Sequence, residues 1–272
     1  MNNFLSRTLT GIVFVLIMAG ALWLGQVSFF VLFLLIIAGS MIEFYRLEEK
    51  KDLQPLKSLG ISLGVVFFIL TFFHASGQIE NLWLGMSVLL FLLPAIAEIF
   101  RKKSNPSNAA SLLTGIVYIG GLLSTANYIV FDPLYSANYS STLILGIFFI
   151  IWINDTMAYV IGKYLGTHKL IQRISPKKTW EGTLAGLLFS ILAAAGFAQF
   201  TPVIDTFHAF GLGGIISVAA NLGDLFESSL KRSAGQKDSG KLLPGHGGIL
   251  DRFDAAIFAI PFAFLYLHLV ML

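Results

Sequence analysis

The 272-residue chain has no cysteine and little charge: charged residues make up 12% of it, against about 25% in a typical soluble domain. The absence of cysteine excludes disulfides, thiolate metal sites and cysteine nucleophiles. The shortage of charge excludes a disordered chain, because such chains are polar. It also leaves too few charged side chains to cover a soluble fold of this size. With 56% hydrophobic residues and a mean hydropathy of +0.79, the chain is suited to lipid.

Long apolar runs predict an all-α, polytopic integral membrane protein with about nine transmembrane helices, since each span needs about 20 mostly apolar residues. The predicted spans are Leu9–Gly25, Val27–Phe44, Ser58–Ala75, Leu82–Phe100, Ala109–Phe131, Leu143–Leu165, Trp180–Phe200, Phe207–Glu227 and Phe253–Leu272. The first run has an alternative interpretation as a cleaved signal peptide, because Ala19-Gly20-Ala21 resembles a cleavage site. The apolar stretch continues beyond that site, which favours a retained helix.

The basic residues gather on one side of these spans. Every Lys and Arg lies before the first span or in, or at the edge of, every second segment that connects two spans. The loops on the opposite side contain only Glu80, Asp132 and Asp205 as charged residues. The positive-inside rule then places the N-terminus in the cytoplasm and the C-terminus outside.

Polar side chains that could carry chemistry are concentrated in the second half of the chain. Residues 1–140 are interpreted as N-terminal membrane scaffold helices with about five spans. Residues 141–272 are interpreted as a catalytic membrane region of about four spans with two cytoplasmic phosphate-binding loops. Within the scaffold, Glu43 and Glu98 lie beside basic clusters, and we expect both to pair with Lys or Arg. No nucleic-acid-binding motif is present.

Polar side chains also occur inside the later spans. Asp155 falls in the cytoplasmic half of the sixth span, where a carboxylate is costly unless it is paired, hydrated or bound to a cation. It could line a polar cavity or belong to a hydrogen-bonded packing cluster. In the eighth span, Asn221, Asp224, Ser228 and Lys231 follow helical spacing and share one face.

Three carboxylates are predicted to meet where the last two spans enter the cytoplasm. Asp251 and Asp254 are three residues apart at the start of the ninth span, so both project from one face, toward the stripe that contains Asp224. Carboxylates held close together repel one another, and a divalent cation removes that penalty. Hard oxygen ligands without cysteine favour Mg²⁺.

The segment between Asp224 and Asp251 combines basic residues with five glycines, and we call its residues 235–248 the glycine-rich loop. The five glycines are Gly235, Gly240, Gly245, Gly247 and Gly248. Glycine lets backbone N–H groups approach an anion closely, and Gly247 and Gly248 also precede the N-terminus of the ninth span, which favours an anion. The segment is therefore predicted to bind phosphate. The alternative is an ordinary basic loop that touches anionic lipid headgroups.

A second cytoplasmic loop contains two adjacent lysines, Lys177 and Lys178, just before the seventh span. Pro176 fixes a turn there, and Thr179 could cap the helix that follows. Two lysines beside a helix N-terminus suit a phosphate group. They could equally be simple markers of membrane topology.

Taken together, these motifs resemble those of phosphatidate cytidylyltransferases, also called CDP-diglyceride synthases. The principal motif is Ser228-x-Leu230-Lys231-Arg232-x4-Lys237-Asp238-x-Gly240-x2-Leu243-Pro244-x-His246-Gly247-Gly248-x2-Asp251-Arg252-x-Asp254. The segments Ser175-Pro176-Lys177-Lys178-Thr179-Trp180-Glu181-Gly182 and Asn154-Asp155-x3-Tyr159 resemble a second and a third motif of that family.

The resemblance implies a nucleotidyltransferase that moves CMP from CTP to phosphatidate, giving CDP-diacylglycerol and pyrophosphate in phospholipid biosynthesis. It implies an Mg²⁺-dependent homodimer in the bacterial inner (cytoplasmic) membrane, with the active site facing the cytoplasm. A second cation such as K⁺ is also compatible with this family.

Helical spacing and the matched motifs together give the expected residue roles. The expected metal ligands are Asp224, Asp251, Asp254 and Asp155. The expected catalytic residues are Asp224, Asp251, Lys231 and Arg232. The expected substrate-binding residues are Ser175, Lys177, Lys178, Lys237, Asp238, His246, Gly247 and Gly248. His246 could donate a hydrogen bond to a phosphate or merely hold the glycine-rich loop.

Three other functions are compatible with parts of the sequence. A polyprenol or phytol kinase would also use CTP but would release CDP, so product analysis separates the two. A cation- or proton-coupled transporter could use intramembrane acids as an ion path. Here, however, the acids cluster at one interface and the two halves of the chain do not match, unlike in many transporters. A purely structural membrane protein is the third alternative.

Overall fold

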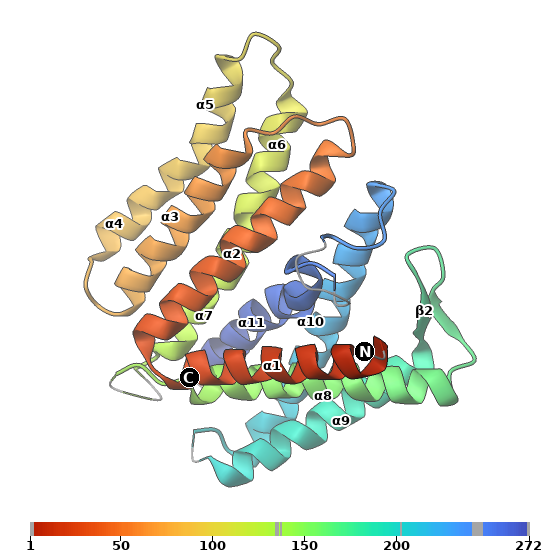
Figure 1. The fold of residues 1–272 in the computed structure, drawn as a ribbon. Coiled ribbons are helices and arrows are strands. Elements are labelled where there is room, and N and C mark those ends of the chain that lie inside the picture. The colour runs from red at the N-terminus through yellow and green to blue at the C-terminus, as the bar shows by residue number, and fades with distance from the viewer. Residues whose placement is uncertain (1–2, 134–135, 137, 202, 241–246, 271–272) are drawn as a thin grey trace. The chain divides into compact units, whose positions relative to one another are not determined.

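Apolar runs form most of the helices in the computed structural model of the chain (Figure 1). The structure describes residues 3–133, 136, 138–201, 203–240 and 247–270, with side chains from residue 11 to residue 269 of these. Within this part of the chain, eight helical segments are long and apolar enough to cross a membrane. The protein is therefore a helical, multi-pass membrane protein. A further apolar helix, α1 (Asn3–Trp23), precedes them at the position of the first predicted span.

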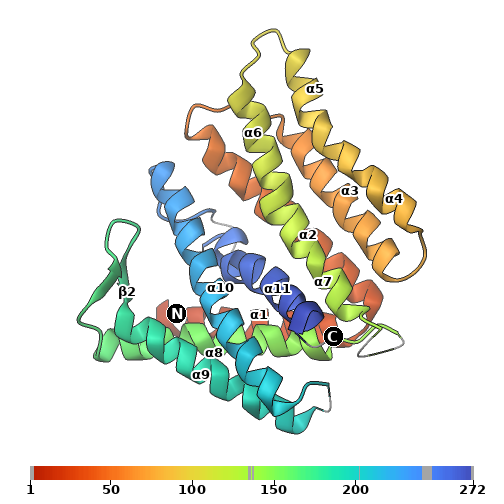
Figure 2. The same cartoon turned by 180° about the vertical axis from the view of Figure 1, so that it is seen from behind.

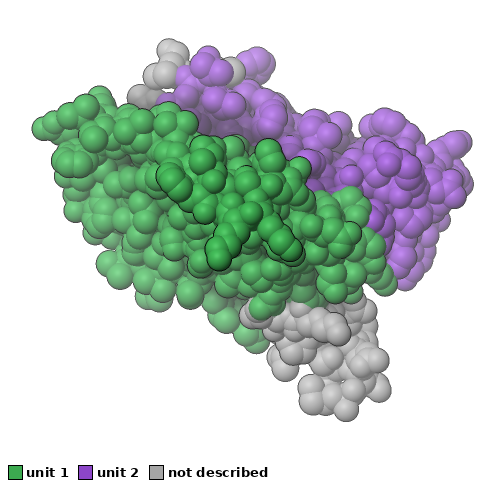
Figure 3. All heavy atoms as spheres, turned by 90° about the horizontal axis from the view of Figure 1, so that it is seen from above, with its two compact units in different colours: residues 1–139, 233–253 green, residues 140–232, 254–272 purple. Residues whose placement is uncertain are grey.

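The helices divide between two compact units, which Figure 3 shows in different colours. Unit 1 comprises residues 1–139 and 233–253, and unit 2 comprises residues 140–232 and 254–272. The segment 233–253, which contains the glycine-rich loop, belongs to unit 1.

Unit 1 is a bundle built around α2 (Gln26–Glu49) and α3 (Lys57–Ala75). The fourth span consists of α4 (Asn81–Met86), the 3₁₀ segment η1 (Ser87–Leu92) and α5 (Leu93–Ile99). The fifth span consists of α6 (Pro106–Gly115), the π-helical segment η2 (Ile116–Gly121) and α7 (Leu122–Val130). Figure 2 shows α3 and the α6–α7 span beside one another. The bundle core is aromatic: Phe29, Phe33 and Phe68 are almost completely buried.

Unit 2 contains α8 (Thr142–Tyr164), α9 (Trp180–Phe200), most of α10 (Thr206–Ser233) and most of α11 (Leu250–Val270). Helices α8 and α9 lie side by side and approach closely at glycine. A Cβ atom added at Gly182 would lie 3.0 Å from Gly162 Cα and 2.5 Å from the backbone oxygen of Ala158. Small residues at such crossings are a common feature of membrane helix packing.

A short β-hairpin between α8 and α9 is the one described departure from the expected all-helical fold. Strands β1 (Lys169–Ile171) and β2 (Ser175–Thr179) pair antiparallel, with Lys169 opposite Thr179 and Ile171 opposite Ser175. A hairpin with only two strands has two open edges, so Pro176, which cannot donate a backbone hydrogen bond, is tolerated in β2. The segment was expected to be a loop.

Candidate functional site

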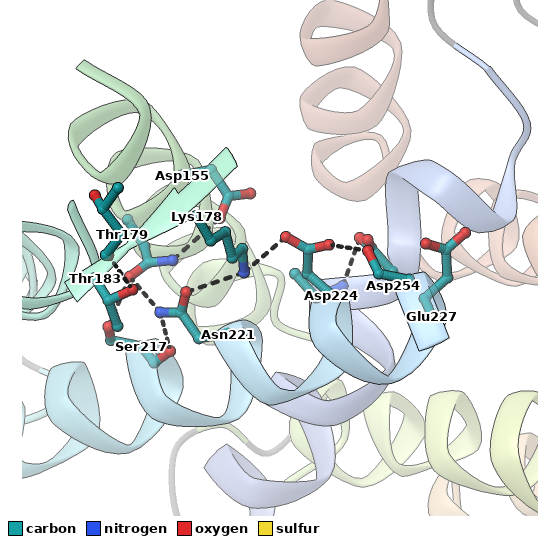
Figure 4. Close-up of polar contacts among 12 residues, drawn as sticks. Asp155, Lys178, Thr179, Thr183, Ser217, Asn221, Asp224, Glu227 and Asp254 are labelled. Atoms are coloured by element: carbon teal, nitrogen blue, oxygen red, sulfur yellow. Dashed lines mark hydrogen bonds and ion pairs between the residues drawn. The ribbon is translucent and has the colours of Figure 1, made fainter. Parts of the chain in front are cut away.

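Three carboxylates converge in unit 2, from α10 and α11. Ligand oxygens of Asp224, Glu227 and Asp254 all lie within 4.8 Å of one another, and Figure 4 shows the three side chains in a row. Asp224 and Glu227 are three residues apart on α10 and therefore share a face. Glu227 is fully buried, whereas the other two are only partly buried. We call these three residues the carboxylate cluster.

Gly223 allows the two helices to approach at this point. A Cβ atom added there would collide with the backbone oxygen of Asp254 and would lie 3.3 Å from Ala255 Cα. No residue with a side chain fits without moving one helix. Because Gly223 directly precedes Asp224, the close crossing brings the Asp224 carboxylate beside that of Asp254.

Two lysines flank the carboxylate cluster. Lys178 Nζ lies 2.7 Å from Asp224 Oδ2 and 3.2 Å from Asn221 Oδ1. Lys231 Nζ lies 2.5 Å from Glu227 Oε2, one helical turn along α10. Both lysine side chains are mostly sheltered from solvent, so salt screens these ion pairs less than it would screen exposed ones. The site therefore combines oxygen ligands for a cation with ammonium groups that suit a phosphate.

The hairpin separates the two adjacent lysines of the second loop. Successive side chains on a strand point to opposite faces. In β2, Lys177 is exposed, whereas Lys178 is partly buried and turned toward α10. The helix that follows is capped by Thr179, whose hydroxyl accepts a hydrogen bond from Gly182 N at 3.2 Å, which confirms the cap expected from the sequence.

A buried amide network continues from Lys178 into the core of unit 2. Asn154 Oδ1 accepts hydrogen bonds from Ser217 Oγ at 2.6 Å and from Asn221 Nδ2 at 3.4 Å. The amide nitrogen of Asn154 donates to Asp155 Oδ1 at 3.1 Å. The exposed Asp155 carboxylate adds negative potential at Asp254. Asp155 therefore belongs to the same electrostatic environment as the carboxylate cluster.

Asp251 lies in unit 1, at the start of α11, where it organises the backbone of the glycine-rich loop. Its Oδ2 atom accepts hydrogen bonds from Ser239 N at 3.0 Å, Ser239 Oγ at 2.9 Å and Gly248 N at 2.7 Å. Gly247 has a φ of 82°, in the left-handed region that favours glycine. The assignment of Asp251 as a metal ligand stays a prediction, as do the roles of Gly247 and Gly248 in binding substrate.

The remaining predicted site residues belong to other segments of the chain. Ser175 begins β2, and Arg232 is exposed in the last turn of α10. Lys237 and Asp238 are exposed in the segment after α10. His246 lies outside the described residues.

Two glutamates emerge from the structure that the sequence reasoning did not place in the site. Glu227 lies at the polar end of the eighth predicted span, and its spacing of three residues from Asp224 is the signal in the sequence that could identify it. The expectation that Glu43 pairs with Lys or Arg is wrong for the part of the chain that the structure describes, because its partners are Ser239 Oγ and Leu250 N. Glu98 does pair with a basic residue, Arg101, at 3.1 Å.

Comparison with known proteins identifies the family. A family model described as the cytidylyltransferase family matches residues 5–270, nearly the whole chain. The chain belongs to the cytidylyltransferase family. As a cytidylyltransferase it is a nucleotidyltransferase enzyme, and its cluster of carboxylates flanked by lysines is the described group of side chains best suited to that chemistry.

Curated relatives match over almost the full length of the cytidylyltransferase. A protein of Staphylococcus saprophyticus named phosphatidate cytidylyltransferase is 33% identical over 263 residues, covering 94% of this chain and 95% of its own. Proteins of the same name from Staphylococcus aureus and Staphylococcus haemolyticus are 31% and 32% identical over 262 residues, with the same coverage of both chains.

Proposed function

We propose that the protein is a phosphatidate cytidylyltransferase, which joins CTP and phosphatidate to give CDP-diacylglycerol and pyrophosphate. The observation that carries the proposal is the carboxylate cluster of Asp224, Glu227 and Asp254 with Lys178 and Lys231 beside it. The printed name of the full-length relatives supplies the substrate. The membrane-spanning fold accords with a lipid substrate.

The proposed reaction needs no strong base. A phosphate oxygen of phosphatidate attacks the α-phosphorus of CTP, a new P–O bond forms, and the bond from the α-phosphorus to the bridging oxygen breaks as pyrophosphate leaves. The main obstacle is the repulsion between two anions. Side chains that bring positive charge to the phosphates lower this barrier.

The donor set of the carboxylate cluster fits Mg²⁺. It offers carboxylate oxygens, which Mg²⁺ prefers, and the sequence contains no cysteine thiolate that would favour a softer metal. When bound, Mg²⁺ supplies positive charge that offsets the repulsion between the phosphates of the two substrates. Asp224, Glu227 and Asp254 would hold it, with Asp251 as the further predicted ligand. The proposal includes a second cation such as K⁺, for which Asp155 is a predicted ligand.

The lysines would bind the phosphates. Lys178 neutralises Asp224 and Lys231 neutralises Glu227 in the structure. We propose that their ammonium groups turn to the phosphates when the carboxylates bind a cation. Arg232, Lys177 and Lys237 have exposed side chains, and we propose that they bind the rest of the triphosphate or the lipid phosphate.

The position of the label in the products tests the reaction. Purified protein in detergent is incubated with phosphatidate, Mg²⁺ and CTP labelled at either the α- or the γ-phosphorus. We expect the α-label in the lipid phase and the γ-label in pyrophosphate. Transfer of the γ-label to a lipid would identify a kinase instead, and an absence of label from the lipid phase in both reactions would refute the proposal.

The proposal extends to orientation and assembly: an N-terminus in the cytoplasm, a C-terminus outside, a cytoplasmic site in the bacterial inner membrane, and a homodimer. Because the chain has no cysteine, single-cysteine variants report orientation directly. Impermeant maleimide added to intact cells should label Glu80→Cys and spare Lys102→Cys, and the reverse would contradict the orientation. Light scattering of the purified protein should give twice the chain mass.

A further inference from the structure

Glu43, toward the C-terminal end of α2 in the membrane scaffold, contacts both described ends of the glycine-rich loop. It lies on α2 and is 0% exposed. Its Oε2 atom accepts hydrogen bonds from Leu250 N at 2.8 Å and from Ser239 Oγ at 2.9 Å. These partners are 207 and 196 residues away along the chain, and all three residues belong to unit 1.

Two glycines of the loop lie directly against this carboxylate. A Cβ atom added at Gly240 would collide with Glu43 Oε1, and one added at Gly248 would collide with Glu43 Oε2. A side chain at either position would therefore displace the Glu43 carboxylate. The loop backbone encloses the carboxylate from two sides.

Glu43 also caps a helix from outside its own segment. Leu250 is the first residue of α11, and N–H groups in the first turn of a helix have no partner within the helix. Glu43 Oε2 accepts the hydrogen bond from Leu250 N, and a carboxylate at a helix N-terminus is further stabilised by the helix dipole. The next residue, Asp251, and then Asp254 follow within one turn.

Ser239 links Glu43 to Asp251, a predicted metal ligand. Its hydroxyl lies 2.9 Å from Glu43 Oε2 and 2.9 Å from Asp251 Oδ2. The two carboxylates therefore share the single hydroxyl hydrogen of Ser239, while Asp251 Oδ2 also accepts from Ser239 N and Gly248 N. A change at Glu43 must therefore alter the hydrogen bonding of Asp251.

We propose that Glu43 is a positioning residue for the transferase reaction. It holds Ser239-Gly240 and Gly248 against the start of α11 and so fixes the direction in which the Asp251 carboxylate leaves that helix. This inference rests on the proposed function for its kinetic consequences. It adds a residue of the scaffold half to the determinants of the site.

Kinetics of three variants test the inference. Glu43→Ala removes the acceptor and should lower kcat about 100-fold at saturating CTP and phosphatidate, because a displacement of about 1 Å at a reacting group can cost that much. Glu43→Gln keeps one oxygen, which can accept from both Leu250 N and Ser239 Oγ as Glu43 Oε2 does, so it should recover to within about threefold of the wild type if position is what matters. Ser239→Ala should fall between the two.

A matched control and a second measurement separate positioning from a general loss of stability. Glu48→Ala, on the same helix, removes another buried carboxylate, which pairs with Lys51. It should leave kcat near the wild-type value. Trypsin should cleave after the exposed Lys237 at least tenfold faster in Glu43→Ala than in the wild type or in Glu48→Ala, because the loop is no longer held.

Three results would overturn the inference. The first is a wild-type kcat in Glu43→Ala. The second is an equal loss of kcat in Glu43→Gln and Glu43→Ala, which would assign the role to charge, and the third is an unchanged rate of trypsin cleavage after Lys237. A wild-type protein that makes no CDP-diacylglycerol would instead refute the proposed function. The protease experiment would then still decide whether Glu43 holds the loop.

Discussion

Lys178 on β2 and Asp224 on α10 form an ion pair of 2.7 Å. The pair joins the second predicted phosphate loop to the carboxylate cluster within unit 2. The short hairpin positions this lysine, because the strand turns Lys178 toward α10 while Lys177 remains exposed. A lysine that neutralises a carboxylate in one state can neutralise a phosphate in another.

The two lysines of β2 should therefore differ in their effect on catalysis. Lys178→Ala should lower kcat/KM for CTP about 100-fold, a loss typical of removing one group that stabilises developing charge. Lys177→Ala should cost at most about fivefold, since an exposed ion pair contributes no more than about 1 kcal/mol. Steady-state kinetics of both variants checks this, and equal losses would show that the strand does not separate their roles.

Gly223 should tolerate no side chain, because a Cβ atom there meets the backbone of Asp254. We expect Gly223→Ala to destabilise the protein by about 1–3 kcal/mol, as overpacking does, and to abolish turnover by separating Asp224 from Asp254. Gly214→Ala on the same helix is the matched control, since its Cβ would meet only Ile191, at 4.0 Å. Thermal unfolding in detergent and turnover should be near wild type in this control. Turnover by Gly223→Ala at the wild-type rate would contradict the prediction.

The cap at Thr179 should contribute to stability more than to chemistry. Thr179→Ala removes the acceptor for Gly182 N and should cost about 1 kcal/mol, which lowers the unfolding temperature by about 2–4 °C. Thr179→Ser keeps the hydroxyl and should lose less. Differential scanning fluorimetry of the two variants measures the difference, and an Ala variant as stable as the Ser variant would argue against the cap.

Asp224→Asn should abolish turnover while the protein stays folded. The amide keeps the shape of the side chain and removes its charge, so both the ion pair with Lys178 and a ligand of the cluster are lost. Turnover should fall at least about 100-fold. Asp205→Asn, at an exposed carboxylate just before α10, is the control. Near wild-type turnover of Asp224→Asn would show that the Asp224 carboxylate is not needed for catalysis.

Much of the fold follows from hydropathy. The predicted spans Trp180–Phe200 and Ser58–Ala75 match α9 and α3 within one residue at each end. Local rules also identified the cap at Thr179 and the polar face of α10, where Ser228 Oγ donates to Asp224 Oδ1 at 3.2 Å. These features depend on residues that are close in sequence, which is why the sequence alone predicted them.

Features that depend on distant residues could not be predicted in the same way. The β-hairpin has only eight strand residues and follows no alternation of apolar and polar residues. The separation of Lys177 from Lys178 follows from that hairpin. The partners of Glu43 lie 196 and 207 residues away, so its position beside a basic cluster suggested an ion pair that does not form in the described part of the chain.

The binding of Mn²⁺, a substitute for Mg²⁺ at carboxylate sites, tests the central claim that Asp224, Glu227 and Asp254 hold a divalent cation. Electron paramagnetic resonance counts the free ion as purified protein is added. The wild type and Asp205→Asn should bind Mn²⁺ with equal affinity, and Asp254→Asn should bind at least about tenfold more weakly. Equal affinity in all three proteins would place the cation elsewhere and contradict the account.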